Sequence, residues 1–438
     1  MIKVTNGLRN DARSNSIVRV REFMRDNSYY IAFFLYSVWT WLSRSSFIDD
    51  GGAVPIKLVE KMVQAIVLVF LSGAFFRTRA TAREFSIAAV LFLLGFIVWR
   101  TAGEGWLFWL ALFIVCGKGV KLSTLSSVAL ASVLLVTLLA GTASAAGVID
   151  NNVVVRGSTG AIRNPLGFDH PNYLGAALLV VCMSLVPFAK GKRIVLLSVC
   201  CVLAACVSGF IADSRACALC LGALALVLPI YEVVRRRGWG RRTGLVLLVA
   251  LIAMVLVSFY FMVFYNPSRT VDALLNSALS GRLQLAHTYY LDHTPGAFGY
   301  SYSDGTVYYA DGKEYTFVVD NLFVHVLLRY GVIACAVFLF GLIALCIKTH
   351  KEKYFGPLLL GMGVFLVYGM SETLGCRVEC NFFIISLWTV LYHRPISDFD
   401  DTVDSARANS ASESNLPNEL SFREFLMLPI RIVRLHRG

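Results

Sequence analysis

The sequence predicts an all-α, polytopic integral membrane protein with about 12 transmembrane helices, both termini in the cytoplasm and one large extracytoplasmic loop. Of the 438 residues, 57% are hydrophobic and only 16% are charged, and the mean hydropathy is +0.66. A soluble domain could not bury so much apolar surface, whereas a bilayer can solvate it. The apolar runs are roughly 18–24 residues long, which fits helices, because the strands of a membrane barrel need only about 10 residues.

Twelve segments of the chain are apolar enough to be expected as spans. The short connector at 101–104 leaves open whether the spans around it cross the membrane separately or form one re-entrant pair. The spans are expected near 29–44, 56–76, 84–100, 105–117, 123–146, 171–189, 194–212, 215–232, 244–265, 321–347, 355–373 and 379–393.

Lysine and arginine are distributed unevenly between the two sides of this arrangement. The N-terminal tail and every second connection carry 22 of them, whereas the opposite connections carry seven. Loops rich in Lys and Arg stay in the cytoplasm, so the side with 22 is predicted to be cytoplasmic. The regular alternation also supports the number of spans, since a missed or extra span would disrupt it. The seven on the opposite side are Arg156, Arg163, Arg215, Arg269, Arg282, Lys313 and Arg377.

The net charge and the cysteines argue against two other classes of partner. A net charge of +12 would suggest nucleic acid in a soluble protein, but the positive-inside distribution accounts for most of it, so we expect no nucleic-acid partner. The 11 cysteines lie mostly in apolar runs without metal-site spacing, which predicts small buried hydrophobic side chains. For Cys376 and Cys380, which flank a short polar loop, a disulfide and helical i,i+4 neighbours are both open.

The chain divides into three regions. Residues 1–28 are expected to form a basic cytoplasmic tail, residues 29–393 the transmembrane domain, and residues 394–438 a cytoplasmic tail with a basic amphipathic end. Within the transmembrane domain, the large outer loop is expected at about 266–320, late in the chain.

Composition also predicts local structure in the loop and in the C-terminal tail. Asp311-Gly312 lies between two short β-prone runs, which predicts a β-hairpin. Residues 396–418 are acidic and rich in Ser and Asn, which predicts disorder. Residues 420–437 mix large apolar side chains with arginines, which predicts an interfacial helix on the anionic inner leaflet, broken or kinked at Pro429.

Ionisable side chains gather at the outer ends of the expected helices. Charges at membrane depth are costly and usually face a cavity. A guanidinium fork matches phosphate oxygens, so several arginines around one cavity suggest a phosphorylated lipid headgroup, and carboxylates or a histidine nearby could supply a general base. The candidates are Arg156, Arg163, His170, Asn172, Arg215, Arg282, Asp320, Asn321, His325, Arg329 and Glu372.

Each candidate also has an ordinary structural explanation. A single arginine at a helix end most often snorkels to the headgroups. Asp320-Asn321 could be a helix N-cap, and His325 could be an interior histidine with satisfied hydrogen bonds. The coincidence of all of these residues on one side of the membrane favours the functional interpretation.

At these residues the sequence resembles the Wzy polysaccharide polymerase and O-antigen ligase superfamily, over about residues 140–390. The resemblance implies about ten to fourteen helices and a large outer loop late in the chain. The matching pieces, in chain order, are Arg163, Gly167-Phe-Asp-His-Pro-Asn-Tyr-Leu-Gly175, Ser214-Arg215, Ser280-Gly281-Arg282, Pro295-Gly-Ala-Phe-Gly299, Asp320-Asn321, Arg329-Tyr-Gly331 and Glu372.

The resemblance implies a glycosyltransferase of the bacterial cytoplasmic membrane, which acts on the outer face without a metal or other cofactor. It would polymerise oligosaccharide repeat units, with donor and acceptor both carried on undecaprenyl diphosphate, into a capsule, exopolysaccharide or O-antigen. A flippase and a chain-length regulator would be its protein partners. In a single inverting displacement, a base would deprotonate the acceptor hydroxyl, which attacks the anomeric carbon as undecaprenyl diphosphate leaves.

The resemblance and the residue chemistry together give each candidate an expected role. The base is expected at Asp320, then His170, then Glu372. Arginines that stabilise the charge of the leaving diphosphate could replace a metal. The diphosphate is expected on Arg163, Arg215 and Arg282, with Arg156 and Arg329 as further candidates, and substrate positioning on Asn172, Asn321 and His325.

Two alternative functions stay open. Ligases of the superfamily transfer the finished glycan to another acceptor and carry His-[Asn/Ser/Gln], nine residues and then Gly. Here Asp320-Asn321 and Gly331 keep that spacing with Asp in place of His, which favours a polymerase. A lipid-linked oligosaccharide flippase or other transporter would predict internal repeats and a polar site near the bilayer midplane, whereas the polar residues here crowd the outer side.

Overall fold

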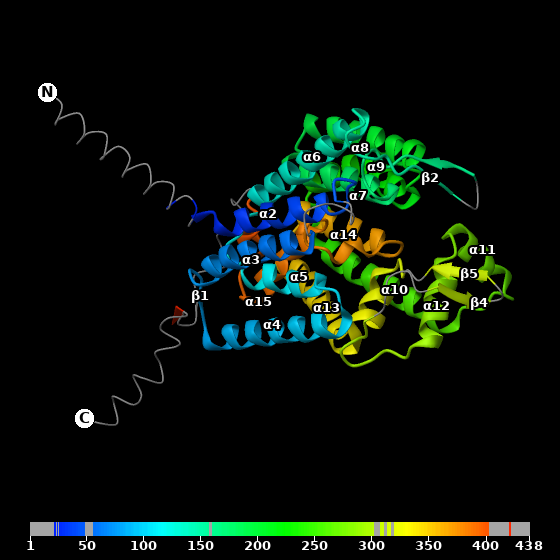
Figure 1. The fold of residues 1–438 in the computed structure, drawn as a ribbon. Helices are drawn as coiled ribbons and strands as arrows, with labels where there is room; N and C mark the ends of the chain where they lie inside the picture. Colours follow the sequence, from blue (N-terminus) through cyan, green and yellow to red (C-terminus); the bar gives the residue numbers. More distant parts are fainter. Residues whose placement is uncertain are drawn as a thin grey trace, which may run out of the picture.

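The computed structural model describes residues 22, 24, 26–48, 56–156, 160–301, 307–310, 313–316, 319–402 and 420–421. Within these ranges the protein is mostly helical, as predicted (Figure 1). The expected basic N-terminal tail up to residue 21, the acidic segment 403–419 and the expected interfacial helix beyond residue 421 lie outside the described residues.

Eight helices in the described ranges are long and apolar enough to cross a membrane, which indicates a membrane-embedded protein. In the most apolar stretches of α3 and α10 only 17% of the residues are buried, so these helices present apolar faces that lipid would cover. The eight are α3 (Ile56–Phe75), α4 (Ala82–Ala102), α6 (Leu122–Ala145), α7 with its 3₁₀ extension η1 (Pro171–Leu185, Val186–Phe188), α8 with its π-helical end η2 (Lys192–Cys206, Val207–Ile211), α9 (Arg215–Arg237), α10 (Thr243–Phe264) and α13 (Leu322–Lys351).

Four further expected spans correspond to shorter helices. A full crossing needs about 20 residues, so twelve complete crossings remain a prediction. These helices are well buried by protein: α2 packs against α3 and α6 and buries Phe33 and Trp41 completely. The four are α2 (Ser28–Leu42), α5 (Trp106–Val115), α14 (Pro357–Gly369) and the pair η5–α15 (Phe382–Ser386, Leu387–Leu391).

The large loop expected at 266–320 has a structure of its own. Its elements are α11 (Thr270–Ala278), α12 (Arg282–Asp292), β4 (Val307–Ala310) and β5 (Lys313–Thr316), which lie together beside the end of α10 (Figure 1). The predicted β-hairpin is confirmed, since β4 and β5 pair antiparallel with Tyr308 opposite Tyr315. In α12, Ala286 and Tyr289 pack against Met262 of α10 and Leu328 of α13, which fixes α12 beside the start of α13.

The remaining short elements lie in connections. Strands β2 and β3 pair antiparallel within the long connection between α6 and α7. Cys376 and Cys380 are free, buried thiols joined by a non-helical turn, so neither the disulfide nor the helical arrangement is found. The elements are β1 (Arg79–Ala80), β2 (Val154–Val155), β3 (Ile162–Arg163), η3 (Trp239–Arg242), η4 (Thr373–Cys376), η6 (Ile396–Asp398) and β6 (Leu420–Ser421).

The expected start of the disordered C-terminal tail is wrong. Ile396 and Phe399 are completely buried, and the Lys121 ammonium donates a hydrogen bond of 2.8 Å to the carbonyl of Asp398. The folded domain therefore continues past residue 393 to about residue 402, because two apolar side chains offset the acidic composition of this segment. The expected interfacial helix does not begin at Leu420 either, since β6 pairs antiparallel with β1.

Helix α13 bends sharply at Gly331, where φ is 90° and ψ is 170°. The bend frees backbone groups that the segment 296–300 satisfies: the amide of Val332 donates to the carbonyl of Gly296 at 2.9 Å, and the amide of Tyr300 donates to the carbonyl of Arg329 at 3.1 Å. A Cβ on Gly331 would lie 2.3 Å from the Gly299 nitrogen, and a Cβ on Gly299 1.9 Å from the Arg329 carbonyl oxygen. Gly299 and Gly331 are therefore both required, because the two backbone segments approach too closely for any side chain.

Candidate functional site

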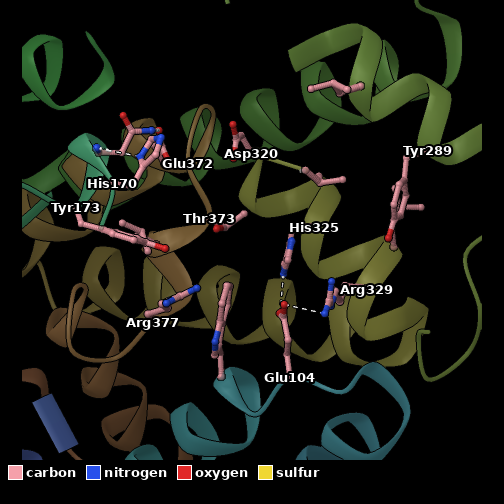
Figure 2. Close-up of a pocket in the computed structure, with 16 residues that line it drawn as sticks. Glu104, His170, Tyr173, Tyr289, Asp320, His325, Arg329, Glu372, Thr373 and Arg377 are labelled. Atoms are coloured by element: carbon pink, nitrogen blue, oxygen red, sulfur yellow. Dashed lines mark hydrogen bonds and ion pairs between the residues drawn. The ribbon is translucent and has the colours of Figure 1, made fainter. Parts of the chain in front are cut away.

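A cavity of about 530 Å³ lies where the start of α7, the α4–α5 connection, α12, α13 and the η4 segment meet (Figure 2). Segments that are far apart in the sequence thus line one space. Six of the predicted site residues line it: His170, Asn172, Asp320, His325, Arg329 and Glu372.

Arg282 forms ion pairs with two carboxylates at the site. Its Nε lies 3.0 Å from Oδ2 of Asp320, and one terminal nitrogen lies 2.9 Å from Oε1 of Glu372. Local backbone structure explains the position of Arg282: Ser280 and Gly281 both have positive φ, 58° and 85°, so the chain reverses after α11 and Arg282 becomes the first residue of α12. Asp320 lies directly before the N-cap of α13, and Glu372 lies directly before η4.

The network continues from Glu372 toward the start of α7. The side-chain amide of Asn172 donates to Oε1 of Glu372 at 3.1 Å, and Arg163 donates to the amide oxygen of Asn172 at 2.6 Å. Arg163 is held in turn by the carbonyl of Ala212 at 3.2 Å. Next to Asn172, His170 caps α7, because its Nδ1 accepts the backbone amide of Asn172 at 3.2 Å. Arginines, carboxylates and one amide thus form a continuous chain of contacts.

Burial and nearby charges shift the pKa values of two candidate bases, Glu372 and His170, in opposite directions. Burial, reinforced by the nearby charge of Asp320, raises the pKa of Glu372 to about 7, although Arg282 opposes the shift. Burial and then the charge of Arg163 lower the pKa of His170, so the imidazole is neutral at neutral pH. A carboxyl group with a pKa near neutrality can both accept and return a proton, which is the property required of a general base.

Asn321, and not Asp320, is the N-cap of α13. Its side-chain oxygen accepts the backbone amides of Phe323 and Val324 at 3.0 and 3.1 Å, and its amide nitrogen donates to Ser258 and to the carbonyl of Met370. Those contacts account for Asn321 as a structural residue rather than the substrate-positioning residue we expected. Asp320 does not cap the helix, and its carboxylate pairs with Arg282.

Arg163 and Arg282 touch cavity-lining residues but do not line the cavity themselves, and Arg156 and Arg215 do not line it either. Arg156 lies 2.5 Å from the Asp213 carboxylate, and Arg215 lies 3.5 Å from the other oxygen of the same carboxylate. The side chain of Arg215 is 49% exposed. These two predicted diphosphate ligands therefore gather around Asp213, whose charge partly neutralises them, and the charges of Arg156 and Asp213 reach Arg163 of the network above.

A second group in the cavity centres on Glu104, which is not one of the predicted site residues. Its carboxylate lies 2.9 Å from Arg329, accepts the Tyr330 hydroxyl at 3.1 Å and lies 3.4 Å from Nε2 of His325 (Figure 2). Burial opposes its ionisation, but His325 and Arg329 hold the pKa of Glu104 below its ordinary value. His325 also stacks on Trp106, with ring centroids 5.5 Å apart. The only sequence signal for Glu104 was a lone carboxylate between two apolar segments.

No metal centre is formed by the described part of the chain, in which no three His, Cys, Asp or Glu side chains are grouped to hold an ion. Comparisons with protein families, with curated proteins and with solved structures match none of them to this chain. The resemblance to the polymerase and ligase superfamily therefore depends on the ordered motifs alone.

Proposed function

We propose that this protein polymerises oligosaccharide repeat units carried on undecaprenyl diphosphate, by inverting glycosyl transfer at the outer face of the bacterial cytoplasmic membrane. The observation that carries the proposal is the cluster in which Arg282 contacts both Asp320 and Glu372 at the cavity wall. Glycosyl transfer from a lipid diphosphate requires a cation that stabilises the leaving group and a base that takes the acceptor proton, and this cluster offers one cation and two carboxylates that could be the base.

In the proposed reaction, Glu372 takes the proton of the acceptor hydroxyl. The hydroxyl oxygen forms a bond to the anomeric carbon as the bond from that carbon to the diphosphate oxygen breaks, and undecaprenyl diphosphate leaves with the electron pair. Arg282, with Arg163 one amide away, stabilises the negative charge that develops on the leaving group. Glu372 suits the base role better than Asp320, which we expected first, because its pKa lies near neutrality.

The arrangement in the membrane is part of the proposal. Twelve crossings with both termini in the cytoplasm would put the large loop outside, in agreement with the division of 22 and seven basic residues. Arg163, Arg282, Asp320 and Glu372 all belong to segments expected at that outer side. Flippase and chain-length regulator proteins would act before and after this reaction.

Surface glycan from a deletion strain, separated on a gel, tests the proposal. A single capped repeat unit is expected, because polymerisation would stop after the first unit. Long chains that stay linked to the lipid would instead identify a ligase, and an absence of lipid-linked glycan from the outer face would identify a flippase. Restoration of long chains by the wild-type gene, but not by an Arg282→Ala variant of equal abundance, would link the result to the cluster.

A further inference from the structure

Arg377 is a cavity-lining cation that forms no ion pair with a carboxylate of the described chain, although the charge of Glu104 lies close enough to interact with it. Its Nε is buried without a hydrogen-bond partner, and within the described ranges its guanidinium forms no ion pair. The guanidinium carbon lies 3.2 Å from the centroid of the Trp106 ring, and Figure 2 shows the side chain pointing into the cavity. By contrast, Arg329, the other arginine that lines the cavity, is paired with Glu104.

The nearest carboxylate, Glu104, compensates for the charge of Arg377 only in part. The two oxygens of Glu104 are already contacted by Arg329, Tyr330 and His325. Arg377 is half-buried and its buried Nε has no hydrogen-bond partner, which is costly unless a ligand in the cavity supplies the missing acceptor. Stacking on Trp106 holds the planar fork in one orientation, which prepares it for a planar oxyanion.

The position of this group separates it from the proposed diphosphate site. Asp320 precedes α13, and a rise of about 1.5 Å per residue puts His325 roughly 7 Å and Arg329 roughly 13 Å further along the helix. A saccharide whose reacting bond lies at Asp320 and Glu372 would therefore extend its neighbouring sugar rings toward Trp106 and Arg377. The diphosphate itself would stay with Arg282.

We propose that Arg377, stacked on Trp106, binds the oxyanion of an acidic sugar in the glycan, next to the bond that is formed. This inference rests on the proposed function for the identity of the glycan. It names a carboxylate-bearing sugar as the ligand class, because a carboxylate accepts the two parallel hydrogen bonds of a guanidinium fork.

Binding to the full-length protein in nanodiscs tests the inference without any polymerisation. Saturation-transfer NMR would compare glucuronic acid with glucose, and farnesyl diphosphate would probe the diphosphate site. We expect glucuronic acid to bind better than glucose, and Arg377→Met to weaken glucuronic acid by about tenfold or more. Farnesyl diphosphate binding should not change. Arg377→Lys should retain part of the glucuronic acid signal, and Arg269→Met, which removes an exposed arginine of the large loop, should retain all of it.

Three results would overturn the inference. Glucuronic acid that binds no better than glucose, or equally to wild type and Arg377→Met, would remove the acidic-sugar site. Loss of farnesyl diphosphate binding in Arg377→Met would assign Arg377 to the diphosphate instead. A lower melting temperature of Arg377→Met, together with glucuronic acid and glucose signals that fall equally, would instead indicate that the contact with Trp106 is only structural. Because no step uses the polymerase reaction, the deletion-strain result can fail while this site stands.

Discussion

Replacing Arg282 with lysine separates charge from geometry at the centre of the site. The guanidinium uses two different nitrogens, one at 3.0 Å from Asp320 and one at 2.9 Å from Glu372. Lysine would keep the positive charge, but its single ammonium cannot reproduce the planar fork. If the same fork binds the leaving diphosphate, Arg282→Lys loses one charge-assisted hydrogen bond in the transition state.

The expected loss follows from that one bond. Removal of one preorganised donor costs about 2–4 kcal/mol in the barrier, which is roughly 30- to 1000-fold in rate. Initial rates of polymerisation by purified protein, with lipid-linked repeat units as donor and acceptor, measure it directly. Arg269→Lys is the matched control, because Arg269 is an exposed arginine of the same loop region. Full activity in Arg282→Lys would show that a point charge suffices, and the argument from bidentate geometry would fall.

Three further outcomes follow from the structure. Asp320→Asn should lower the polymerisation rate, because it removes one of the two carboxylates that hold Arg282 in position, whereas the N-cap of α13, Asn321, is left intact. The rate should rise as pH increases through about 7, where Glu372 loses its proton and becomes a base, and Glu372→Gln should be slow and lack this rise. A single cysteine at Ser301, in a Cys-free background, should react with an impermeant reagent in intact cells, because the large loop is proposed to lie outside.

Each of these outcomes has a clear opposite. Full-length polymer from Asp320→Asn would leave Asp320 with no part in the chemistry. An unchanged pH profile in Glu372→Gln would move the base to another residue, with the neutral His170 next. Labelling at Ser301 only after cell lysis would reverse the proposed orientation of the membrane domain.

The elements of the fold could be predicted from apolar segments and turn residues, but their lengths could not. Asp311-Gly312 predicted the hairpin because that pair favours the backbone conformation of a two-residue turn. The segment 105–117 was expected as a span or as half of a re-entrant pair, and its helix has ten residues, too few for a full crossing. Apolar side chains look alike in sequence whether lipid or protein surrounds them, so short helices buried by protein are extended into expected spans. For a similar reason the burial of Ile396 and Phe399 could not be predicted, because they are two apolar residues in an otherwise acidic and polar segment.

The candidate site was partly predictable. The expected topology indicated which ionisable residues share one side of the membrane, but it did not indicate which of them contact one another. Arg282, Asp320 and Glu372 were each predicted, and the contact between them depends on the packing of α12 against α13. Glu104 was missed because it is one carboxylate in a short connection, and its role appears only when α13 brings Arg329 beside it. Arg377 was counted among the outer basic residues, but its stacking on Trp106 depends on the tertiary structure.

The bend of α13 couples the large loop mechanically to the cavity. The segment 296–300 shares three backbone hydrogen bonds with the bend, at Arg329, Val332 and Ile333. An outward movement of the loop must break these bonds or carry the start of α13 with it. In the second case Arg329 would be pulled away from Glu104, so a movement of this segment would open an ion pair on the cavity wall.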